Sequence, residues 1–271
     1  MTYLQAIILG FVQGAAEFLP ISSSGHLIIF QNWLGLDTEG TSYLAFDVLL
    51  HIGTLVSVLL IFWKDVLGLI IAFFKMLFDL VTKGKLNLEK SEYRKLTIML
   101  IIAAVPLVIG AFFEKFIAHF PMWAVGIMLL VTGVILILTS KIKNNNKDLK
   151  TARFKDALVV GLSQLVAIIP GLSRSGTTIF AGMAMGLSKE FAVRFSFLLS
   201  MIAILGAAAL SLDDLSTGVV ATFGWQAFVG TLTAAIVGVV AIKWLINLIS
   251  KGKYSWLAWY CFVMGLVVII F

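Results

Sequence analysis

A cluster of polar residues near the amino end has the types and spacing that hydrolytic chemistry requires. Gln13 and Glu17 are four residues apart, which places both side chains on one face of a short helix. Pro20 then interrupts the hydrophobic run, and the segment SSSGH at 22–26 follows it. A hydroxyl beside a carboxylate and an imidazole can act as a nucleophile while the base accepts its proton. The candidates for catalysis are therefore Glu17, one of the serines and His26.

A second polar stretch, PGLSRSGTT at 170–178, contains an arginine. Gly and Ser turns at a helix N-terminus present free backbone N–H groups and the positive end of the helix dipole, and both attract anions. Arg174 adds a planar guanidinium suited to two phosphate oxygens. An arginine at membrane depth costs about 2.5–3.5 kcal/mol on insertion scales, so it needs a partner. That partner is either an anionic ligand or, in a purely structural alternative, Glu17.

Together the two stretches predict a site for a phosphate or diphosphate rather than for a cation alone. In a simpler alternative the serines only cap two helices, but one serine suffices for a cap, and neither Glu17 nor His26 is then explained. Catalysis is assigned to Glu17, Ser23, His26 and Arg174. The phosphate contacts are assigned to Ser22, Ser24, Gly25, Ser173, Ser175, Gly176, Thr177 and Thr178.

The elements that hold these residues must lie in a membrane. Of the 271 residues 61% are hydrophobic and 13% charged, and the mean hydropathy is +1.06, whereas about a quarter of a soluble domain is charged. We expect an all-α polytopic membrane protein that forms a single integral membrane domain over 1–271. Six segments are long and apolar enough to cross a hydrocarbon core of about 30 Å: 43–63, 96–113, 120–140, 195–212, 215–242 and 254–271.

Four shorter apolar pieces form two pairs, each folded about one of the polar stretches. The pairs are 3–16 with 27–36, and 157–172 with 175–187. Irregular backbone at membrane depth is tolerated only inside protein or against a water-filled cavity. The pattern therefore predicts two re-entrant helical hairpins whose turns face each other or water.

The two hairpins belong to an internal repeat. With an offset of 151 residues, 2–26 aligns with 153–177 without a gap, and seven of 25 positions are identical. Each copy, about 1–140 and about 153–271, continues with three spans, so an odd number of crossings separates the copies and the second is predicted to be inverted. Inverted repeats place their ligand site at the interface between the copies, near the midplane. The alignment pairs Ser23 with Arg174, and this divergence makes Ser23 the first serine to consider as the nucleophile.

Positive charge predicts the topology. Lys and Arg cluster at 83–95, 141–155 and 251–253, so these three loops are expected in the cytoplasm. The loops around 37–39, 114–115 and 213–214 and both termini then lie outside. Topology and anionic lipid account for the net charge of +6, and no nucleic acid is implied.

Other polar residues are expected to support the fold. Asp47 and His51, four residues apart, and Arg194 are predicted to pair between helices, with support of the site as a second role. Segment 64–81 is predicted to be an amphipathic cytoplasmic helix. Small residues at 206–210 can pack helices within one chain or in a homo-oligomer.

Three motifs carry a resemblance to a known family. LGFVQGAAEFLPISSSGH at 9–26, PGLSRSGTT at 170–178 and RFSFLLS at 194–200 resemble the signatures of the bacterial undecaprenyl-diphosphate phosphatases, whose members give bacitracin resistance. The resemblance runs the whole length of the chain. It implies removal of the terminal phosphate from a C55 polyprenyl diphosphate at the outer face of the bacterial cytoplasmic membrane, which recycles the lipid carrier for cell-wall synthesis.

The resemblance also implies roles for single residues. Gln13 and Glu17 fill the family's Glu/Gln-x-x-x-Glu motif and would hold a divalent cation, Mg²⁺ or Ca²⁺. Ser23 matches the family's nucleophilic serine, His26 its histidine and Arg174 its phosphate-binding arginine. The amide Gln13 is a poorer metal ligand than a carboxylate and no base, so proton transfer is expected to fall to Glu17 or His26.

Two questions stay open at the level of sequence. Inverted repeats with broken helices are also a transporter design, so a transporter or flippase of a polyprenyl phosphate lipid is the rival function. The attacking group is also undecided between Ser23, His26 and a water molecule activated by Glu17 and His26.

Overall fold

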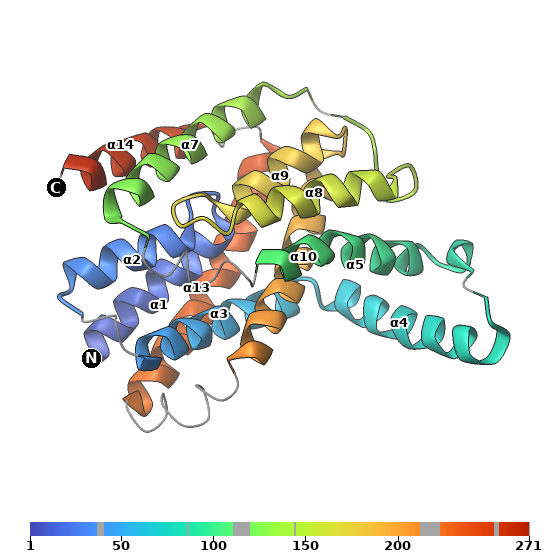
Figure 1. The fold of residues 1–271 in the computed structure, drawn as a ribbon, viewed down its shortest axis with the longest axis horizontal. Helices are drawn as coiled ribbons and strands as arrows, with labels where there is room; N and C mark the ends of the chain where they lie inside the picture. The colour runs from blue at the N-terminus through green and yellow to red at the C-terminus, as the bar shows by residue number, and fades with distance from the viewer. Residues whose placement is uncertain are drawn as a thin grey trace.

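The structure, a computed structural model, describes residues 1–36, 41–85, 87–110, 120–143, 145–211, 223–251 and 255–270. These residues form helices and connecting turns without any β-strand (Figure 1). The helices are α1 (Tyr3–Phe18), α2 (Ser23–Trp33), α3 (Thr41–Ile61), α4 (Trp63–Lys83), the short 3₁₀ helix η1 (Leu88–Lys90), α5 (Glu92–Gly110), α7 (Met122–Lys141), α8 (Phe154–Val166), α9 (Arg174–Ala184), α10 (Lys189–Leu210), α13 (Trp225–Ser250) and α14 (Trp256–Ile270).

Five of these helices, α3, α5, α7, α10 and α13, are long and apolar enough to cross a membrane, which confirms the polytopic all-α class. The predicted span 215–242 is displaced: its helix begins at Trp225, after Gly224 with a φ of +47°, and continues to Ser250. The sixth predicted span, 254–271, has only 15 described helical residues, about 22 Å of helix. The predicted outer loops around 37–39, 114–115 and 213–214 lie outside the described residues.

Both predicted hairpins are present. Helices α1 and α2 pack together around Pro20, and α8 and α9 pack together around Gly171, whose φ of +90° favours glycine. Each hairpin packs against a helix of the other half of the chain, α1 against α13 and α8 against α5 (Figure 1). The two halves are therefore interleaved, while their inverted relation stays a prediction.

Repeat-equivalent glycines allow these contacts. A Cβ atom added to Gly10 would lie 2.3 Å from the carbonyl oxygen of Gly230, and one added to Gly161 would lie 2.5 Å from that of Ala103. Small residues let helix backbones approach closely in a membrane, where no hydrophobic effect drives helices together. The same glycine thus serves the same purpose in both hairpins.

The end of α1 is fixed by aromatic packing next to Glu17. Phe18 is fully buried and meets Phe197 of α10 edge to face, with 5.4 Å between ring centroids. Phe62 packs on the same Phe197 ring. Because edge-to-face pairs contribute about 0.5–1.5 kcal/mol beyond their buried area, this cluster holds α1 and α10 at a fixed separation.

The predicted amphipathic helix is α4. Its buried residues Val66, Leu69, Ala72 and Met76 recur every three or four positions, and α4 lies beside α5, away from the two hairpins (Figure 1). Asp79 also faces α5, where Arg94 donates a hydrogen bond of 2.7 Å to it. The hydrogen bonds from Lys83 and Arg94 hold the pKa of the Asp79 carboxyl well below its ordinary value.

Arg194 forms the predicted pair between helices. Its guanidinium donates two hydrogen bonds to the Asp65 carboxylate at the start of α4, with N–O distances of 2.5 and 3.0 Å. Tyr93 of α5 donates to the same carboxylate at 3.2 Å. Three helices, α4, α5 and α10, are thereby joined at one carboxylate.

The close helix contacts lead to a stability prediction. Gly10→Ala should lower the unfolding temperature in detergent, because the added methyl group overpacks α1 against α13 at a cost of about 1–3 kcal/mol. Gly206→Ala is the matched control, since Gly206 is also helical and a Cβ there has no neighbour within 4 Å. Equal unfolding temperatures for the two variants would contradict the close packing of α1 on α13.

Candidate active site

A cavity of about 470 Å³ lies where the two hairpin turns meet α3 and α10. Both hairpin turns, α3 and α10 contribute most of the lining residues, and α5 and α8 contribute one each. The polar residues that line the cavity are Glu17, Ser22, Ser23, Ser24, Asp47, His51, Gln164, Arg174 and Ser211. Its apolar lining includes Leu44, Val48, Leu107, Ile168, Leu172 and Ile204.

Glu17 is at the centre of the polar contacts. The side chain is buried at the end of α1, where the Ser23 hydroxyl donates a hydrogen bond of 2.6 Å and the Gln13 amide one of 3.0 Å to Oε2. Arg174 from the second hairpin forms an ion pair with Oε1. A buried carboxylate is costly unless it is paired and hydrogen-bonded, so both hairpins are needed to keep Glu17 ionised.

The serine turn of the first hairpin is held in an unusual conformation. Ser22 caps α2 through a hydrogen bond of 3.3 Å from the Gly25 amide, and its own φ is +73°. A non-glycine residue in this region costs about 1–3 kcal/mol. The amides of Ser23 and Ser24, in the first turn of α2, donate to no acceptor among the described residues. They are therefore free for an anion at the cavity wall.

The two turns are in direct contact, as the sequence predicts. A Cβ added to Gly25 would lie 3.0 Å from the Cα of Gly171, and one added to Gly176 would lie 3.2 Å from the Cβ of Pro20. The Thr132 hydroxyl of α7 links to the second turn, since it donates to the Gly171 carbonyl and accepts from the Ser173 amide. The backbone breaks are thus satisfied inside protein, as membrane depth requires.

Three buried polar atoms around Glu17 have no hydrogen-bond partner within the described part of the chain. They are the donors Arg174 NH1 and Gln164 Nε2 and the acceptor Gln13 Oε1. Buried polar groups are rarely left unpaired, so each is a candidate contact for a ligand. Arg174 and Gln164 line the cavity, whereas Gln13 does not, and together with the free helix amides these two residues suit an anion with several oxygens.

His26 lies on the other side of its helix, away from this cavity. It lines a separate apolar cavity with Phe11, Phe30 and Tyr260. Its Nδ1 lies 2.8 Å from the Ser22 carbonyl oxygen and must donate to it, because a carbonyl only accepts; Tyr260 meets Nε2 at 2.8 Å. The described contacts therefore let His26 hold the strained Ser22 turn rather than touch a ligand beside Glu17.

The polar residues of the second turn, apart from Arg174, are buried, and the Thr177 hydroxyl among them has no hydrogen-bond partner within the described residues. Ser173 caps α9 by accepting from the Gly176 amide at 3.1 Å, and Thr178 hydrogen-bonds Ser196 of α10 at 2.6 Å. None of the five predicted phosphate ligands of this turn, nor Gly25 of the first turn, lines the cavity. The five are Ser173, Ser175, Gly176, Thr177 and Thr178.

The structure adds three residues to the predicted site. His51 Nε2 lies 3.7 Å from Glu17 Oε2, and its Nδ1 donates to the Asp47 carbonyl at 2.7 Å, so Nε2 is the ring nitrogen that faces Glu17. Asp47 accepts from Gln31 at 2.8 Å and also lines the cavity. Gln164 was signalled by its identity with Gln13 in the repeat, and His51 by its spacing from Asp47.

A divalent cation fits this site only together with a ligand. The described residues contain no group of three His, Cys, Asp or Glu side chains that could hold a metal ion. The unpaired oxygen of Gln13 beside Glu17 leaves one protein ligand available. Mg²⁺ commonly keeps several waters and binds through one or two side chains plus substrate phosphates, which is the arrangement this donor set can support.

Fold and cavity together define a multi-pass α-helical membrane protein in which two broken-helix hairpins enclose a cavity suited to an anion. Comparison with known sequences gives the family. The profile described as bacitracin resistance protein BacA matches residues 6–267, and the chain belongs to this family.

Curated relatives match over the full length. A protein named undecaprenyl-diphosphatase from Halothermothrix orenii is 43% identical over 274 residues, which cover 100% of this chain and 98% of the relative. Proteins of the same name from Methanobrevibacter smithii and Alkaliphilus metalliredigens are 42% and 40% identical, covering 99% and 100% of this chain and 97% and 99% of the relatives. The family resemblance of the three motifs is confirmed.

The unpaired donor of Gln164 leads to a binding prediction. Gln164→Met removes the amide but keeps the side-chain length, so we expect affinity for inorganic diphosphate to fall about tenfold or more, because a hydrogen bond to a charged group contributes about 1.5–3 kcal/mol. The unfolding temperature of the ligand-free protein should stay the same or rise, because an unsatisfied buried donor is removed. Calorimetric titration and thermal unfolding of the two proteins measure both effects. Unchanged affinity would exclude Gln164 as a ligand contact.

Proposed function

We propose that this protein hydrolyses undecaprenyl diphosphate to undecaprenyl phosphate and inorganic phosphate. The hydrogen bond of 2.6 Å from the Ser23 hydroxyl to the Glu17 carboxylate supports this most directly. It joins a nucleophile to a base at the wall of a cavity with unpaired donors for phosphate. The names of the relatives point to the same reaction.

In the proposed reaction Ser23 Oγ attacks the terminal phosphorus while Glu17 Oε2 accepts the hydroxyl proton. The bond from that phosphorus to the bridging oxygen breaks, and undecaprenyl phosphate leaves. Water then attacks the phosphoserine, releases inorganic phosphate and restores the Ser23 hydroxyl. Phosphoryl transfer needs mainly positioning and neutralisation of charge, so the remaining groups act by binding.

The binding groups come from both hairpins. Arg174 NH1, Gln164 Nε2 and the free amides of Ser23 and Ser24 can donate to the oxygens of the transferred phosphoryl group. Arg174 forms an ion pair with Glu17, and its side chain is 21% exposed. The same guanidinium can therefore contact the Glu17 carboxylate and the transferred phosphoryl group at once. His51, whose Nε2 faces Glu17, is placed to relay the proton that Glu17 accepts.

A divalent cation would be held by Gln13 Oε1 and Glu17 together with the diphosphate. Its contribution when bound is neutralisation of the negative charge on the phosphate oxygens. The Gln13 amide nitrogen donates to Glu17 Oε2 at 3.0 Å, and this hydrogen bond fixes the orientation of the amide and so of its oxygen. That the cation would be Mg²⁺ or Ca²⁺ is implied only by the resemblance to the family.

The proposed setting is the bacterial cytoplasmic membrane, with the cavity open to the outer face. The basic loops predicted to be cytoplasmic support this orientation. The isoprenoid tail would stay in the bilayer, and the apolar side chains beside the polar cavity, such as Leu44 and Leu107, would contact its first units. The product is the lipid carrier for cell-wall polymers, and its recycling accounts for the bacitracin resistance of the family name.

The roles of Ser23 and Glu17 can be tested in detergent. Ser23→Ala and Glu17→Gln should each lower kcat for phosphate release from a polyprenyl diphosphate by about 10²–10⁴-fold, since each removes one half of the nucleophile and base pair. Ser24→Ala is the matched control: Ser24 lines the same cavity, but its hydroxyl lies 3.5 Å from that of Ser22 rather than beside Glu17. Full activity of Ser23→Ala would leave water as the attacking group and overturn the covalent route.

The same assay separates hydrolysis from transport. Solubilised protein has no two sides between which a lipid can be moved, yet a phosphatase still releases phosphate there. An absence of phosphate release from the folded wild-type protein with added Mg²⁺ or Ca²⁺ would favour the flippase alternative. The nucleophile and base in the turns have no purpose in a carrier that only binds and releases.

Replacement of Gln13 tests the cation site. Gln13→Glu should lower the Mg²⁺ or Ca²⁺ concentration for half-maximal activity, because a carboxylate is a stronger ligand than an amide. Gln164→Glu provides a control with the same change of charge at the repeat-equivalent position. It should weaken substrate binding without improving cation affinity. Activity that persists after chelation and dialysis would exclude the cation.

A further inference from the structure

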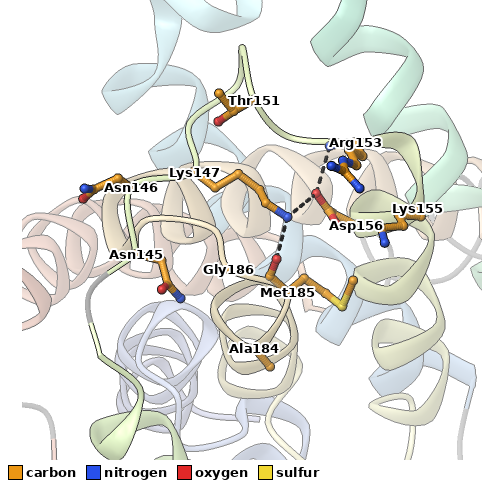
Figure 2. Close-up of a pocket in the computed structure, with 10 residues that line it drawn as sticks. All are labelled: Asn145, Asn146, Lys147, Thr151, Arg153, Lys155, Asp156, Ala184, Met185 and Gly186. Atoms are coloured by element: carbon orange, nitrogen blue, oxygen red, sulfur yellow. Dashed lines mark hydrogen bonds and ion pairs between the residues drawn. The ribbon is translucent and has the colours of Figure 1, made fainter.

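A second cavity, of about 630 Å³, lies at the base of the second hairpin, between the segment before α8 and the turn from α9 to α10 (Figure 2). Helix α8 begins beside it at Phe154 and extends for 13 residues, about 20 Å, towards the turn that carries Arg174. This cavity is therefore separate from the candidate active site and is formed by the opposite end of the same hairpin. It lies in the loop region that positive charge assigns to the cytoplasm.

The cavity carries an excess of positive charge. Lys147, Arg153 and Lys155 line it, and Asp156 is the single acidic residue among the lining residues (Figure 2). Lys147 Nζ is held by Asp156 Oδ2 at 3.0 Å and by the Met185 carbonyl at 2.7 Å. Neither Arg153 nor Lys155 has an acidic partner in the described part of the chain. Two cations are thus available for an anion.

Hydrogen bonds hold the walls of the cavity in place. Asp156 is fully buried and also accepts from the Arg153 amide at 2.8 Å. The Ser188 amide donates to the Lys147 carbonyl at 2.9 Å, and the Asn145 side chain donates to the Met183 carbonyl at 3.3 Å. The segment before α8 is thereby attached to the end of α9, so the cavity exists without a ligand.

One buried acceptor of the cavity remains unpaired. Asp156 Oδ1 has no hydrogen-bond partner among the described residues. A buried carboxylate oxygen needs a donor, such as a hydroxyl or ammonium group. The cavity thus combines two free cations for a phosphate with one acceptor for a donor group on the same ligand.

An apolar strip runs from this cavity along α8. Phe154, Leu158 and Leu162 are four residues apart, which places them on one face, and they are 40%, 44% and 48% exposed. In a membrane this strip contacts acyl chains. A ligand that has its phosphate in the cavity and its tail on the strip satisfies both features, whereas free phosphate satisfies only the first.

We propose that this cavity is a binding site for the headgroup of an anionic phospholipid, with its phosphate between Arg153 and Lys155 and its acyl chain along α8. A glycerol headgroup has hydroxyl groups that can donate a hydrogen bond to Asp156 Oδ1. Basic pockets at the cytoplasmic side of membrane helices bind anionic headgroups in this way. The bound lipid would join the segment before α8 to the turn after α9, and so stabilise the hairpin that carries Gln164 and Arg174.

Lipid titration of the full-length protein tests this site. In phosphatidylcholine nanodiscs with increasing phosphatidylglycerol, the wild-type unfolding temperature should rise and then saturate. Arg153→Gln/Lys155→Gln should bind phosphatidylglycerol roughly 25-fold more weakly, about fivefold for each charge removed. Both side chains are exposed and form no ion pair with the described residues, so the double variant should unfold like the wild type in pure phosphatidylcholine.

Lys141→Gln/Lys143→Gln is the matched control. It removes the same charge from the same loop, but neither residue lines the cavity. Equal weakening in both double variants would mean a general attraction to the anionic surface and would overturn the site. Stabilisation of the wild type by inorganic phosphate in pure phosphatidylcholine, to the extent reached with phosphatidylglycerol, would overturn the lipid as the ligand. Neither outcome depends on the proposed hydrolysis, which is measured separately by phosphate release.

Discussion

The ion pair between Glu17 and Arg174 is the interaction on which the rest of the structure depends. The two residues come from different hairpins, and each would be a costly charge at membrane depth without the other. Their pairing requires the ends of α1 and α9 to meet inside the bundle. The close packing of α1 on α13 and of α8 on α5 positions those ends. The ion pair predicted as the structural role of Arg174 is therefore present, and the candidate site is built around it.

The broken helices impose a second constraint, because every free backbone group at this depth must be satisfied. Most are satisfied by protein: Thr132 serves both the Gly171 carbonyl and the Ser173 amide. The amides of Ser23 and Ser24 are left over, together with Arg174 NH1 and Gln164 Nε2. Several unsatisfied donors thus lie at one cavity, although the Thr177 hydroxyl and the Arg174 and Ser175 amides of the second turn also have no partner among the described residues. Such a concentration is expected where a ligand completes the hydrogen bonding.

Hydropathy and turn residues could predict the spans, the two hairpins and the contact of their turns. Those features depend on local composition and on the rule that broken backbone must be enclosed. The direction of single side chains could not be predicted in this way. His26 is beside the serines in sequence, but its side chain points away from the cavity and contacts Tyr260. Thr178 likewise points to Ser196 of α10. His51 and Gln164 had signals in spacing and in the repeat, but that they share a cavity with Glu17 depends on how α3 and α8 are placed around the turns.

Comparison of the two copies explains which residues carry chemistry. Identical positions make the same capping hydrogen bond, since Ser22 accepts from Gly25 at 3.3 Å and Ser173 from Gly176 at 3.1 Å, although φ is +73° at Ser22 and −68° at Ser173. Positions that differ supply the nucleophile, the carboxylate and the guanidinium. Ser23 aligns with Arg174, and the Glu17 position is Ile168 in the second copy, which lines the cavity as an apolar side chain.

A serine cap used twice therefore presents two different side chains at the position that follows the cap. The first copy contributes the hydroxyl and the carboxylate that accepts its proton, and the second contributes the guanidinium that pairs with that carboxylate. Two identical copies would place either two carboxylates or two guanidinium groups in one buried cavity, and like charges there repel strongly. Divergence at these two positions is thus what allows the shared turn to become a neutral, stable site that still contains both a base and a cation.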